Sequence, residues 1–372
     1  MNAGGRARGP GNKDAIASAR QILERAIAGR VFPAASFVVG SSADEPLDDA
    51  LGTLTFDRGS PPIDPGTSFD LASLTKVVAT TTVLMELARA GRLRLDEPVS
   101  LFFEEWRGTD RETVTVRDLL EHASGLPARL IDVPPASRRE FEHDICRMPL
   151  EYAPRTQSIY SDLDFILLGF VAADRGGAPL AELFDKITAD VVTGFSRTVD
   201  IAGLTFDLPP DRKRLAAPTL PLMEDPRRGR TLAGKVHDNY AAALGGTAGH
   251  AGLFGSARAV GAFARLVLRA ARGERDSPPP FSPELVALFT TKTTVPASSR
   301  ALGWDTMLPS SSCGTRMSPR AFGHVGFTGT SLWIDPERDR YFVLLTNRAC
   351  GGGSVEDMRT VRREFHDALG DF

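Results

Sequence analysis

The chain of 372 residues lacks the features that mark several large classes of protein. No stretch is long and apolar enough to cross a membrane as a helix. Its three cysteines, Cys146, Cys313 and Cys350, are far apart and in no C-x-x-C spacing, which predicts free thiols in a reducing compartment and argues against zinc. A net charge of −3 gives no drive towards nucleic acid or anionic membranes. The sequence therefore implies no metal, no cofactor and no nucleic-acid partner.

Residues 1–12 are polar and rich in glycine, and they lack the apolar segment of a secretory signal. We therefore expect a short disordered N-terminus and a cytoplasmic protein. The remaining residues, 13–372, are expected to form a single domain. Within it, an α/β subdomain of about residues 13–75 and 256–372 would carry an inserted, mostly helical lobe of about residues 76–255.

Apolar runs that predict strands occur near both ends of the chain, at residues 35–40 and 51–56 and again at 321–327, 331–335 and 341–346. Between them, the apolar residues recur mostly with helical spacing. This order predicts an α/β (α+β) fold in which one antiparallel sheet is assembled from both chain ends. The last of these strands is apolar on both faces, so we expect it in the centre of the sheet.

Lysine is scarce because arginine supplies most of the positive charge, and the only S-x-x-K in the chain is Ser73-Leu-Thr-Lys76. Apolar residues from Leu74 to Ala88 recur with the spacing of an amphipathic helix. Residues three apart lie on one side of a helix, so Ser73 and Lys76 can share a pocket. A lysine that loses its proton there can activate the hydroxyl as a nucleophile, and the helix N-terminus favours an oxyanion.

Three further segments accompany Phe69-Asp-Leu-Ala-Ser73-Leu-Thr-Lys76 in a fixed order. They are Leu119-Leu-Glu-His-Ala-Ser-Gly-Leu-Pro127, Tyr160-Ser161-Asp162 and Gly323-His324-Val325-Gly326-Phe327-Thr-Gly-Thr-Ser331. Together the four segments resemble the motifs of the serine β-lactamase/penicillin-binding protein superfamily. The resemblance is strongest to the branch of class C β-lactamases, D,D-peptidases, D-aminopeptidases and β-lactamase-fold esterases. It implies a β-lactamase/transpeptidase-like fold, with the antiparallel sheet flanked by N- and C-terminal helices, and a catalytic role for residues 13–372.

The same resemblance implies roles for individual residues. Ser73 would attack a carbonyl carbon and form an acyl-enzyme. Lys76, as a free amine, would help to remove the Ser73 proton, and Tyr160 would be the second basic group, passing a proton to the leaving group and then activating water. Which of the two is the true base stays open. The backbone N–H groups of Ser73 and Phe327 would form the oxyanion hole.

The substrate-binding positions that the family implies are Asp162, His324, Val325 and Gly326, and three of them depart from the pattern of class C β-lactamases. His324 stands in place of Lys and Val325 in place of Thr, so a substrate carboxylate would be held more weakly. Asp162 stands in place of Asn, and it would repel another anion or simply cap the following helix. These changes favour a neutral ester, or an amide with a positive group, over a penicillin.

The leading hypothesis is a serine hydrolase that cleaves small esters, a carboxylesterase of the β-lactamase fold. A D-aminopeptidase, a D,D-peptidase or a weak β-lactamase is one alternative, and in a D-amino-acid peptidase Asp162 could accept the free amine of the substrate. An acyltransferase of secondary metabolism and a non-catalytic, self-associating scaffold are the others. The variable lobe sets the substrate, so the physiological substrate and the oligomeric state stay open.

Other residues that invite a functional interpretation are expected to be structural. His122 and Ser124 would fix a loop by hydrogen bonds, which makes Ser124 a weak rival nucleophile. The glycine-rich run from Gly245 to Gly252 follows no clear strand and contains no G-K-[ST], so it is not a phosphate-binding loop. We expect His250, which lies within this run, to be structural as well.

Overall fold

The computed structural model describes residues 10–130, 134–195, 201–370 and 372. Residues 1–9, which belong to the segment expected to be disordered, lie outside these ranges. Helix α1 already begins at Pro10. No helix of the described residues is both long and apolar enough to span a membrane.

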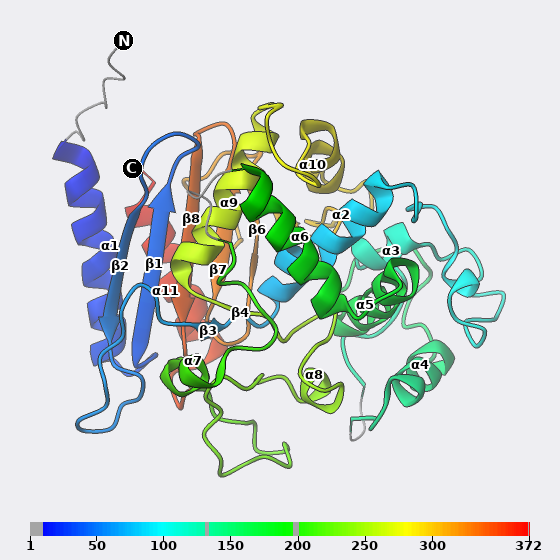
Figure 1. The fold of residues 1–372 in the computed structure, drawn as a ribbon, viewed down its shortest axis with the longest axis horizontal. Coiled ribbons are helices and arrows are strands. Elements are labelled where there is room, and N and C mark those ends of the chain that lie inside the picture. The colour runs from blue at the N-terminus through cyan, green and yellow to red at the C-terminus, as the bar shows by residue number, and fades with distance from the viewer. Residues whose placement is uncertain (1–9, 131–133, 196–200, 371) are drawn as a thin grey trace.

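A six-stranded sheet in the order β2-β1-β8-β7-β6-β5 forms one half of the molecule (Figure 1). Its strands are β1 (Ala34–Gly40), β2 (Leu47–Gly52), β5 (Asp305–Thr306), β6 (Phe322–Val325), β7 (Ser331–Asp335) and β8 (Arg340–Thr346). All neighbouring pairs are antiparallel, and β1 pairs with β8 from Ala35 opposite Thr346 to Gly40 opposite Tyr341. The prediction of an antiparallel sheet built from both chain ends is confirmed, and β8 is buried near its centre.

Helices cover both faces of this sheet. The terminal helices α1 (Pro10–Ala28) and α11 (Val355–Ala368) pack together on one face, and α9 (Ala257–Ala271) covers the other (Figure 1). Successive strand residues point to opposite faces. The Phe37 ring therefore lies 5.5 Å from that of Phe365 in α11, whereas Val38 packs against Gly261 of α9, where a Cβ would come within 2.9 Å of it.

The remaining helices form mostly the lobe on the other side of the molecule (Figure 1). They are α2 (Thr81–Arg89), α3 (Val116–Leu120), α4 (Arg138–Arg147), α5 (Asp162–Gly176), α6 (Leu180–Phe195), α7 (Pro210–Leu215), α8 (Asn239–Ala243) and α10 (Pro283–Thr290), with a 3₁₀ turn at Val99–Leu101. Helix α5 is buried from residue 162 to residue 172 because its sequence is apolar on all sides. A small second sheet of β3 (Phe69–Asp70) and β4 (Phe254–Gly255) joins lobe and main sheet.

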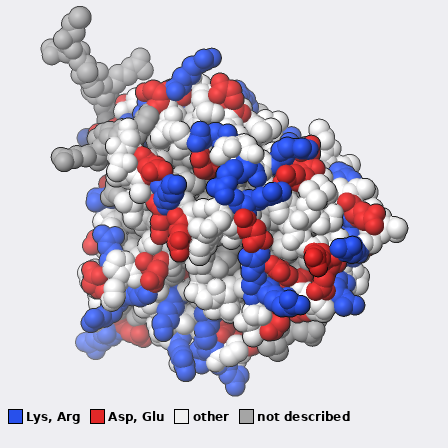
Figure 2. Space-filling model, turned by 45° about the vertical axis from the view of Figure 1, so that its right-hand side comes forward, with Lys and Arg blue, Asp and Glu red and all other residues white. Residues whose placement is uncertain are grey.

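The position of the second strand is a correction to the sequence-based prediction. It runs over Leu47–Gly52, not over residues 51–56. The reason is that β2 is an edge strand with the half-buried carboxylates of Asp48 and Asp49, so its sequence lacks an apolar run. Charges of both signs are interspersed over the face drawn in Figure 2, as the small net charge leads one to expect.

Candidate active site

Ser73 lies on a sharp turn between β3 and the helical segment that begins at Leu74. The turn forces Ala72 into the left-handed region at φ 48°, which residues other than glycine rarely adopt. Two hydrogen bonds hold it there: Ala72 N–H donates to Asp70 Oδ1 at 2.8 Å, and Thr75 Oγ1 donates to Ala72 O at 2.6 Å. The partly exposed Ser73 side chain therefore stands at the start of a helix, as predicted.

The helix after Ser73 departs from the regular α-helix that the sequence predicts. Residues Lys76–Thr80 form a buried π-helical turn, and α2 follows from Thr81. Both ends of this turn are tied to one loop, because Thr80 Oγ1 donates to Gly249 O at 2.7 Å and Lys76 Nζ to His250 O at 3.3 Å. Single π-helical turns inside helices are frequent at functional sites.

Lys76 is fully buried beneath Ser73. Its Nζ lies 3.2 Å from Ser73 Oγ and 2.8 Å from Asp162 Oδ1. Burial lowers the pKa of Lys76, but the Asp162 carboxylate and the Tyr160 phenol outweigh burial, and the pKa lies above its usual value. The free amine expected from the sequence is therefore wrong for the resting protein: Lys76 is an ammonium that donates to Ser73.

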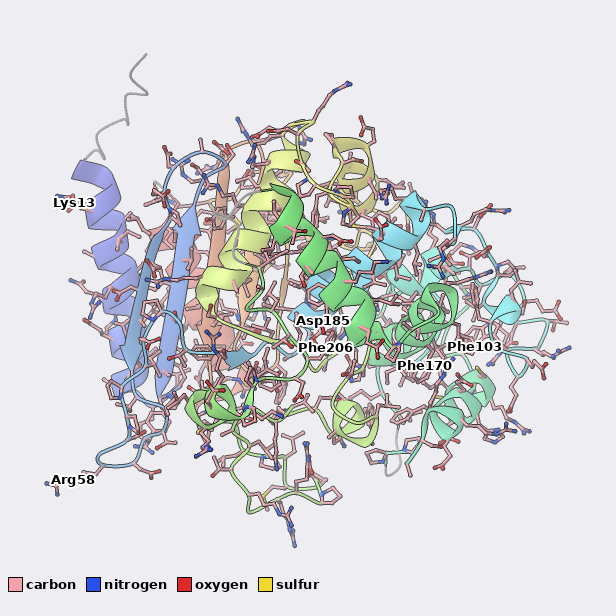
Figure 3. The ribbon with its side chains drawn as sticks, viewed as in Figure 1. Lys13, Arg58, Phe103, Phe170, Asp185 and Phe206 are labelled. Carbon is pink, nitrogen blue, oxygen red and sulfur yellow. The ribbon has the colours of Figure 1, made fainter. Side chains whose placement is uncertain are left out.

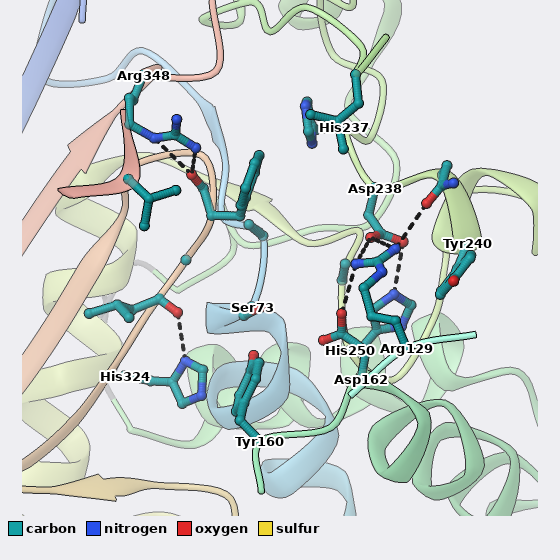
Figure 4. Close-up of a pocket in the computed structure, with 18 of the residues that line it drawn as sticks. Ser73, Arg129, Tyr160, Asp162, His237, Asp238, Tyr240, His250, His324 and Arg348 are labelled. Atoms are coloured by element: carbon teal, nitrogen blue, oxygen red, sulfur yellow. Dashed lines mark hydrogen bonds and ion pairs between the residues drawn. The ribbon is translucent and has the colours of Figure 1, made fainter. Parts of the chain in front are cut away.

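Asp162 belongs to a chain of charged residues that crosses one wall of the site (Figure 4). Its second oxygen accepts from Arg129 at 2.9 Å, Arg129 reaches Asp238 at 3.3 Å, and Asp238 accepts from His250 Nε2 at 2.8 Å. The three groups Asp162, Asp238 and His250 lie close enough to hold a metal ion, but Lys76 pairs with Asp162, and Arg129 pairs with both carboxylates.

This network corrects two expectations for Asp162. Both of its oxygens are occupied by cations of the chain, so neither is free to accept the amine of a substrate. The N-cap of α5 is Ser161, whose Oγ accepts from Leu163 N at 3.2 Å. Burial raises the pKa of Asp162, but Lys76 is the main charge that brings it below its usual value, so the carboxylate is ionised.

Tyr160 stands beside both Lys76 and the third motif. Its ring centre lies 4.7 Å from Lys76 Nζ, 4.8 Å from the His122 ring and 5.7 Å from the His324 ring. Figure 4 shows its hydroxyl directed towards Ser73. The structure thus brings together the three residues predicted as catalytic.

His324 is buried and neutral. Its Nδ1 lies 2.8 Å from Val325 O and must donate to it, so the proton is on Nδ1 and Nε2 carries a lone pair. Burial lowers the pKa of His324 far below its usual value, and Arg300 and Lys76 lower it further. His324 therefore brings no positive charge to this position, and its Nε2 offers the pocket an acceptor with no partner in the described chain.

The turn between β6 and β7 packs directly on the Ser73 turn. A Cβ on Gly326 would lie 2.1 Å from Thr330 Oγ1 and 2.7 Å from Leu71 O, so only glycine fits there. Thr328 Oγ1 donates to Asp70 O at 2.8 Å and Thr330 Oγ1 to Leu71 O at 2.9 Å. Gly326 thus allows the backbone of this turn to pack closely against the backbone of the Ser73 turn.

Phe327 follows Gly326, and its backbone N–H, like that of Ser73, donates no hydrogen bond within the described part of the chain. Two arginines hold the carbonyls around it: Arg362 Nη2 donates to Gly326 O at 2.7 Å, and Arg348 Nη2 donates to Phe327 O at 2.5 Å. The Phe327 ring is 44 % exposed and lies under the Arg348 guanidinium at 4.6 Å.

These groups open into a pocket of about 850 Å³. Lobe residues, Tyr160, Asp162 and Asp238 among them, line it together with residues of the sheet such as His324 and Phe327. Val325 and Gly326 line it as well, whereas Lys76 lies beneath its floor.

The site and the fold can now be compared with known proteins. The family described as Beta-lactamase matches residues 19–367. The chain belongs to the Beta-lactamase family. A relative from Escherichia coli K12, named "Putative D-alanyl-D-alanine carboxypeptidase", is 32 % identical over 313 residues, which cover 76 % of this chain and 69 % of the relative. A relative of the same name from Salmonella gallinarum is 31 % identical over 312 residues, with the same coverage of both chains.

Solved structures confirm the β-lactamase fold. EstCE1, "a hydrolase with promiscuous acyltransferase activity", aligns with a TM-score of 0.74 at 18 % identity, covering 96 % of this chain and 99 % of its own. A class C β-lactamase from Rhodobacter sphaeroides aligns with a TM-score of 0.71 at 19 % identity, covering 95 % and 98 %. At such identities the likeness bears on the fold alone. The predicted superfamily and fold class are both confirmed.

Within this Beta-lactamase family site, two of the residues expected to be structural, His122 and Ser124, lie outside the pocket lining, whereas His250, also expected to be structural, lines the pocket. Ser124 is fully buried and donates to Asp164 Oδ1 at 2.6 Å, and His122 Nδ1 accepts from Ser161 N–H at 3.2 Å. Sequence reasoning missed Arg129, Asp238 and Arg300. No motif marks these residues, because each joins the site through contacts with distant parts of the chain.

Proposed function

We propose that this Beta-lactamase family protein is a serine hydrolase that cleaves carboxylic esters through an acyl-enzyme on Ser73. One observation carries the proposal: Ser73 Oγ lies 3.2 Å from the buried Lys76 Nζ and opens into the pocket beside two backbone N–H groups that have no acceptor in the described chain. Because both lobe and sheet line the pocket, we treat residues 13–372 as one catalytic domain.

The roles of the catalytic residues follow from their charges. Ser73 Oγ attacks the carbonyl carbon, and the N–H groups of Ser73 and Phe327 stabilise the oxyanion. Lys76, as an ammonium, cannot accept a proton, but it stabilises negative charge that develops on the Ser73 and Tyr160 oxygens. Tyr160 therefore relays the proton: its oxygen accepts the Ser73 proton while its own phenolic proton passes to the leaving alcohol. In the second half, water attacks the acyl carbon, the Tyr160 oxygen accepts a proton from that water, and the phenolic proton of Tyr160 returns to Ser73 Oγ as the acid is released.

The binding residues favour an ester over a substrate with a free amine. Asp162, the acidic one of the four predicted binding residues, is already neutralised by Lys76 and Arg129. Val325 offers no side-chain hydrogen bond, and neutral His324 offers only an acceptor. The free-amine requirement of a D-aminopeptidase therefore has no counterpart in this wall of the pocket.

A D,D-carboxypeptidase is the second candidate. The curated relatives at 32 % and 31 % identity carry the name "Putative D-alanyl-D-alanine carboxypeptidase". The two candidates differ in the scissile bond, so parallel assays on an aryl ester and on an acyl-D-alanyl-D-alanine peptide separate them. Transfer to an added alcohol instead of water is measured in the same ester assay.

Labelling with a fluorophosphonate probe, followed by intact-mass analysis, tests the nucleophile. We expect one adduct on the wild type and on Ser124→Ala, and none on Ser73→Ala, with circular dichroism showing that all three proteins are folded. No adduct on the folded wild type would refute the hydrolase proposal and favour the non-catalytic scaffold. An adduct that survives Ser73→Ala but not Ser124→Ala would place the nucleophile at Ser124.

A further inference from the structure

One end of the pocket is lined by large apolar side chains that the catalytic scheme above does not use. Leu222, Phe327 and Val355 come from three separate segments, namely the loop between α7 and α8, the turn between β6 and β7, and the start of α11. Their side chains are between 44 % and 58 % exposed, and Leu220 and Met223 on the same loop as Leu222 are exposed as well. Exposed apolar side chains that gather around a cavity mark a surface that a ligand covers.

The loop between α7 and α8 is held in place by hydrogen bonds. His237 Nε2 lies 3.1 Å from Leu220 O and donates to it. Arg227 pairs with Asp225 at 2.6 Å and donates to His237 O at 2.7 Å, which closes the loop on itself. The His237 ring in turn stacks on that of Phe327, with the ring centres 5.2 Å apart. The apolar side chains are therefore fixed at the mouth of the pocket, which reduces the entropy lost when a ligand binds.

This apolar surface and Tyr160 lie on opposite sides of Ser73. Figure 4 shows Tyr160 on one side of Ser73 and His237 and Arg348 on the other, and these two contact the Phe327 ring at 5.2 and 4.6 Å. In the proposed function the phenolic proton of Tyr160 passes to the leaving alcohol, so the leaving group lies towards Tyr160. The acyl group is the other substituent of the carbonyl carbon, and it therefore extends away from Tyr160, towards Phe327.

The polar side chains at this end already bond within the chain. Arg348 donates to Phe327 O and to Gly353 O, and the Asp225 carboxylate is paired with an arginine of its own loop. Burial lowers the pKa of His237, so its imidazole is neutral at pH 7. Glu224, which also lines this end and is exposed, would repel an anionic acyl group.

We propose that this surface binds an uncharged apolar acyl chain, so that the protein prefers esters of medium-chain fatty acids to esters of acetic acid. The inference rests on the proposed function and names the acyl part of its substrate. Because Leu222, Phe327 and Val355 line the same pocket as Ser73, the chain that covers them belongs to the substrate and not to a partner protein. Each methylene that is buried against them raises kcat/KM, since the acyl chain keeps these contacts in the transition state.

The 4-nitrophenyl esters of acetate, butanoate, hexanoate and octanoate share one leaving group and test this preference at concentrations below micelle formation. We expect the wild-type kcat/KM to rise about twofold for each methylene from butanoate to octanoate, less than for complete burial because the lining side chains are themselves half exposed. The double variant Leu222→Asn/Val355→Thr should lose most of this rise, because both new side chains are polar and of similar size to the old ones. A flat series for the wild type, or a rise that persists in the double variant, would overturn the assignment.

The matched control is Leu101→Asn. Leu101 is 64 % exposed on the 3₁₀ turn and does not belong to the lining of the pocket. Phe103, two residues further along the chain, lies towards the right-hand edge of the molecule in Figure 3, away from the loop between α7 and α8. This variant should keep the wild-type dependence on chain length, and loss of that dependence would show that it does not report on the pocket.

Failure of this inference and failure of the proposed function give different results. Turnover of the acetate ester and fluorophosphonate labelling of Ser73 report on the hydrolase proposal and require no long acyl chain. Calorimetric titration of Ser73→Ala with octanamide and butanamide needs no turnover at all. Octanamide should bind about tenfold more tightly than butanamide, and adding Leu222→Asn and Val355→Thr should abolish this difference. Equal binding of the two amides to Ser73→Ala would refute the apolar site.

Discussion

The two walls of the pocket hold their positive charges in different ways. On the wall formed by the lobe, Lys76 and Arg129 each lie within hydrogen-bonding distance of the Asp162 carboxylate. On the wall formed by the sheet and α11, Arg348 and Arg362 donate to backbone carbonyls, and neither pairs with a carboxylate of the described residues.

A carboxylate cancels most of the field of a neighbouring cation, whereas a carbonyl dipole leaves the net charge in place. The lobe wall is therefore nearly neutral, and it keeps Lys76 protonated. The sheet wall keeps two guanidinium charges behind the Phe327 N–H, where the oxyanion would form. Burial lowers the pKa of Arg362 to about 9, so this side chain is still charged at neutral pH.

Substitution of Lys76, on the lobe wall, should have the largest effect on activity. Lys76→Met removes the ammonium beneath Ser73 and leaves Asp162 with Arg129 alone. We expect kcat/KM for an aryl ester to fall about 10³-fold, and the rate of fluorophosphonate labelling to fall with it. Labelling at the wild-type rate in a folded Lys76→Met protein would show that Lys76 does not activate Ser73.

Substitution of Gly326, on the sheet wall, should reduce activity somewhat less. In Gly326→Ala the new Cβ would clash with Thr330 Oγ1 and Leu71 O, so the turn that carries Phe327 must move away from Ser73. We expect kcat to fall about 100-fold, the cost of losing one oxyanion donor. Gly194→Ala is the control, because a Cβ there meets nothing within 4 Å and its activity should be unchanged.

A conservative substitution of Arg362, also on the sheet wall, should have a smaller effect on activity. Arg362→Lys keeps a charge, but an ammonium cannot reproduce the fixed geometry with which one guanidinium nitrogen bridges Gly326 O and Thr330 O. We expect kcat to fall about tenfold with little change in KM, and the affinity for a boronate transition-state analogue to fall in parallel. Equal losses in kcat and in ground-state binding of the ester would contradict an effect on the oxyanion.

Asp238, at the far end of the lobe network, should affect stability more than activity. Burial raises the pKa of Asp238, but His250 and Arg129 outweigh it and hold the pKa below the usual value near 3.8. A lowered carboxylate pKa stabilises the fold above the unfolded-state value, and this contribution is lost as the pH falls below it. Asp238→Asn should therefore lower the free energy of unfolding by about 2 kcal/mol at pH 7 and by less at pH 3. Urea titrations at both pH values measure this loss. An equal loss of unfolding free energy at pH 7 and pH 3 would exclude the Asp238 charge as its cause.

Part of the fold and of the site could be predicted from the sequence, because it depends on local patterns. The apolar runs predicted the sheet, and the spacing of Ser73 and Lys76 predicted their contact at the start of a helix. Ser256 and Ser282 cap α9 and α10 in the way that a serine before an apolar periodic segment indicates. Each of these features is determined by residues within one or two turns of one another.

The charge states of the site residues could not be predicted from the sequence, because they depend on partners far along the chain. Lys76 is protonated because Asp162, 86 residues away, and Tyr160 outweigh the effect of its complete burial. Arg129 meets Asp238 across 109 residues, and neither belongs to a recognisable motif. The π-helical turn at Lys76–Thr80 likewise follows contacts with the loop at residues 249–250, which helical periodicity does not contain.

The pairing of β1 with β8 has a consequence for the synthesis of the protein. β1 ends at Gly40, but its partner begins only at Arg340, so a growing chain carries β1 for some 300 residues before β8 leaves the ribosome. At 5–20 residues per second this takes roughly 15–60 s. During that time one edge of β1 is open to pairing with other strands. Slow stages of translation and early termination should therefore expose this chain to aggregation, and a chaperone that shields β1 would act on the nascent protein.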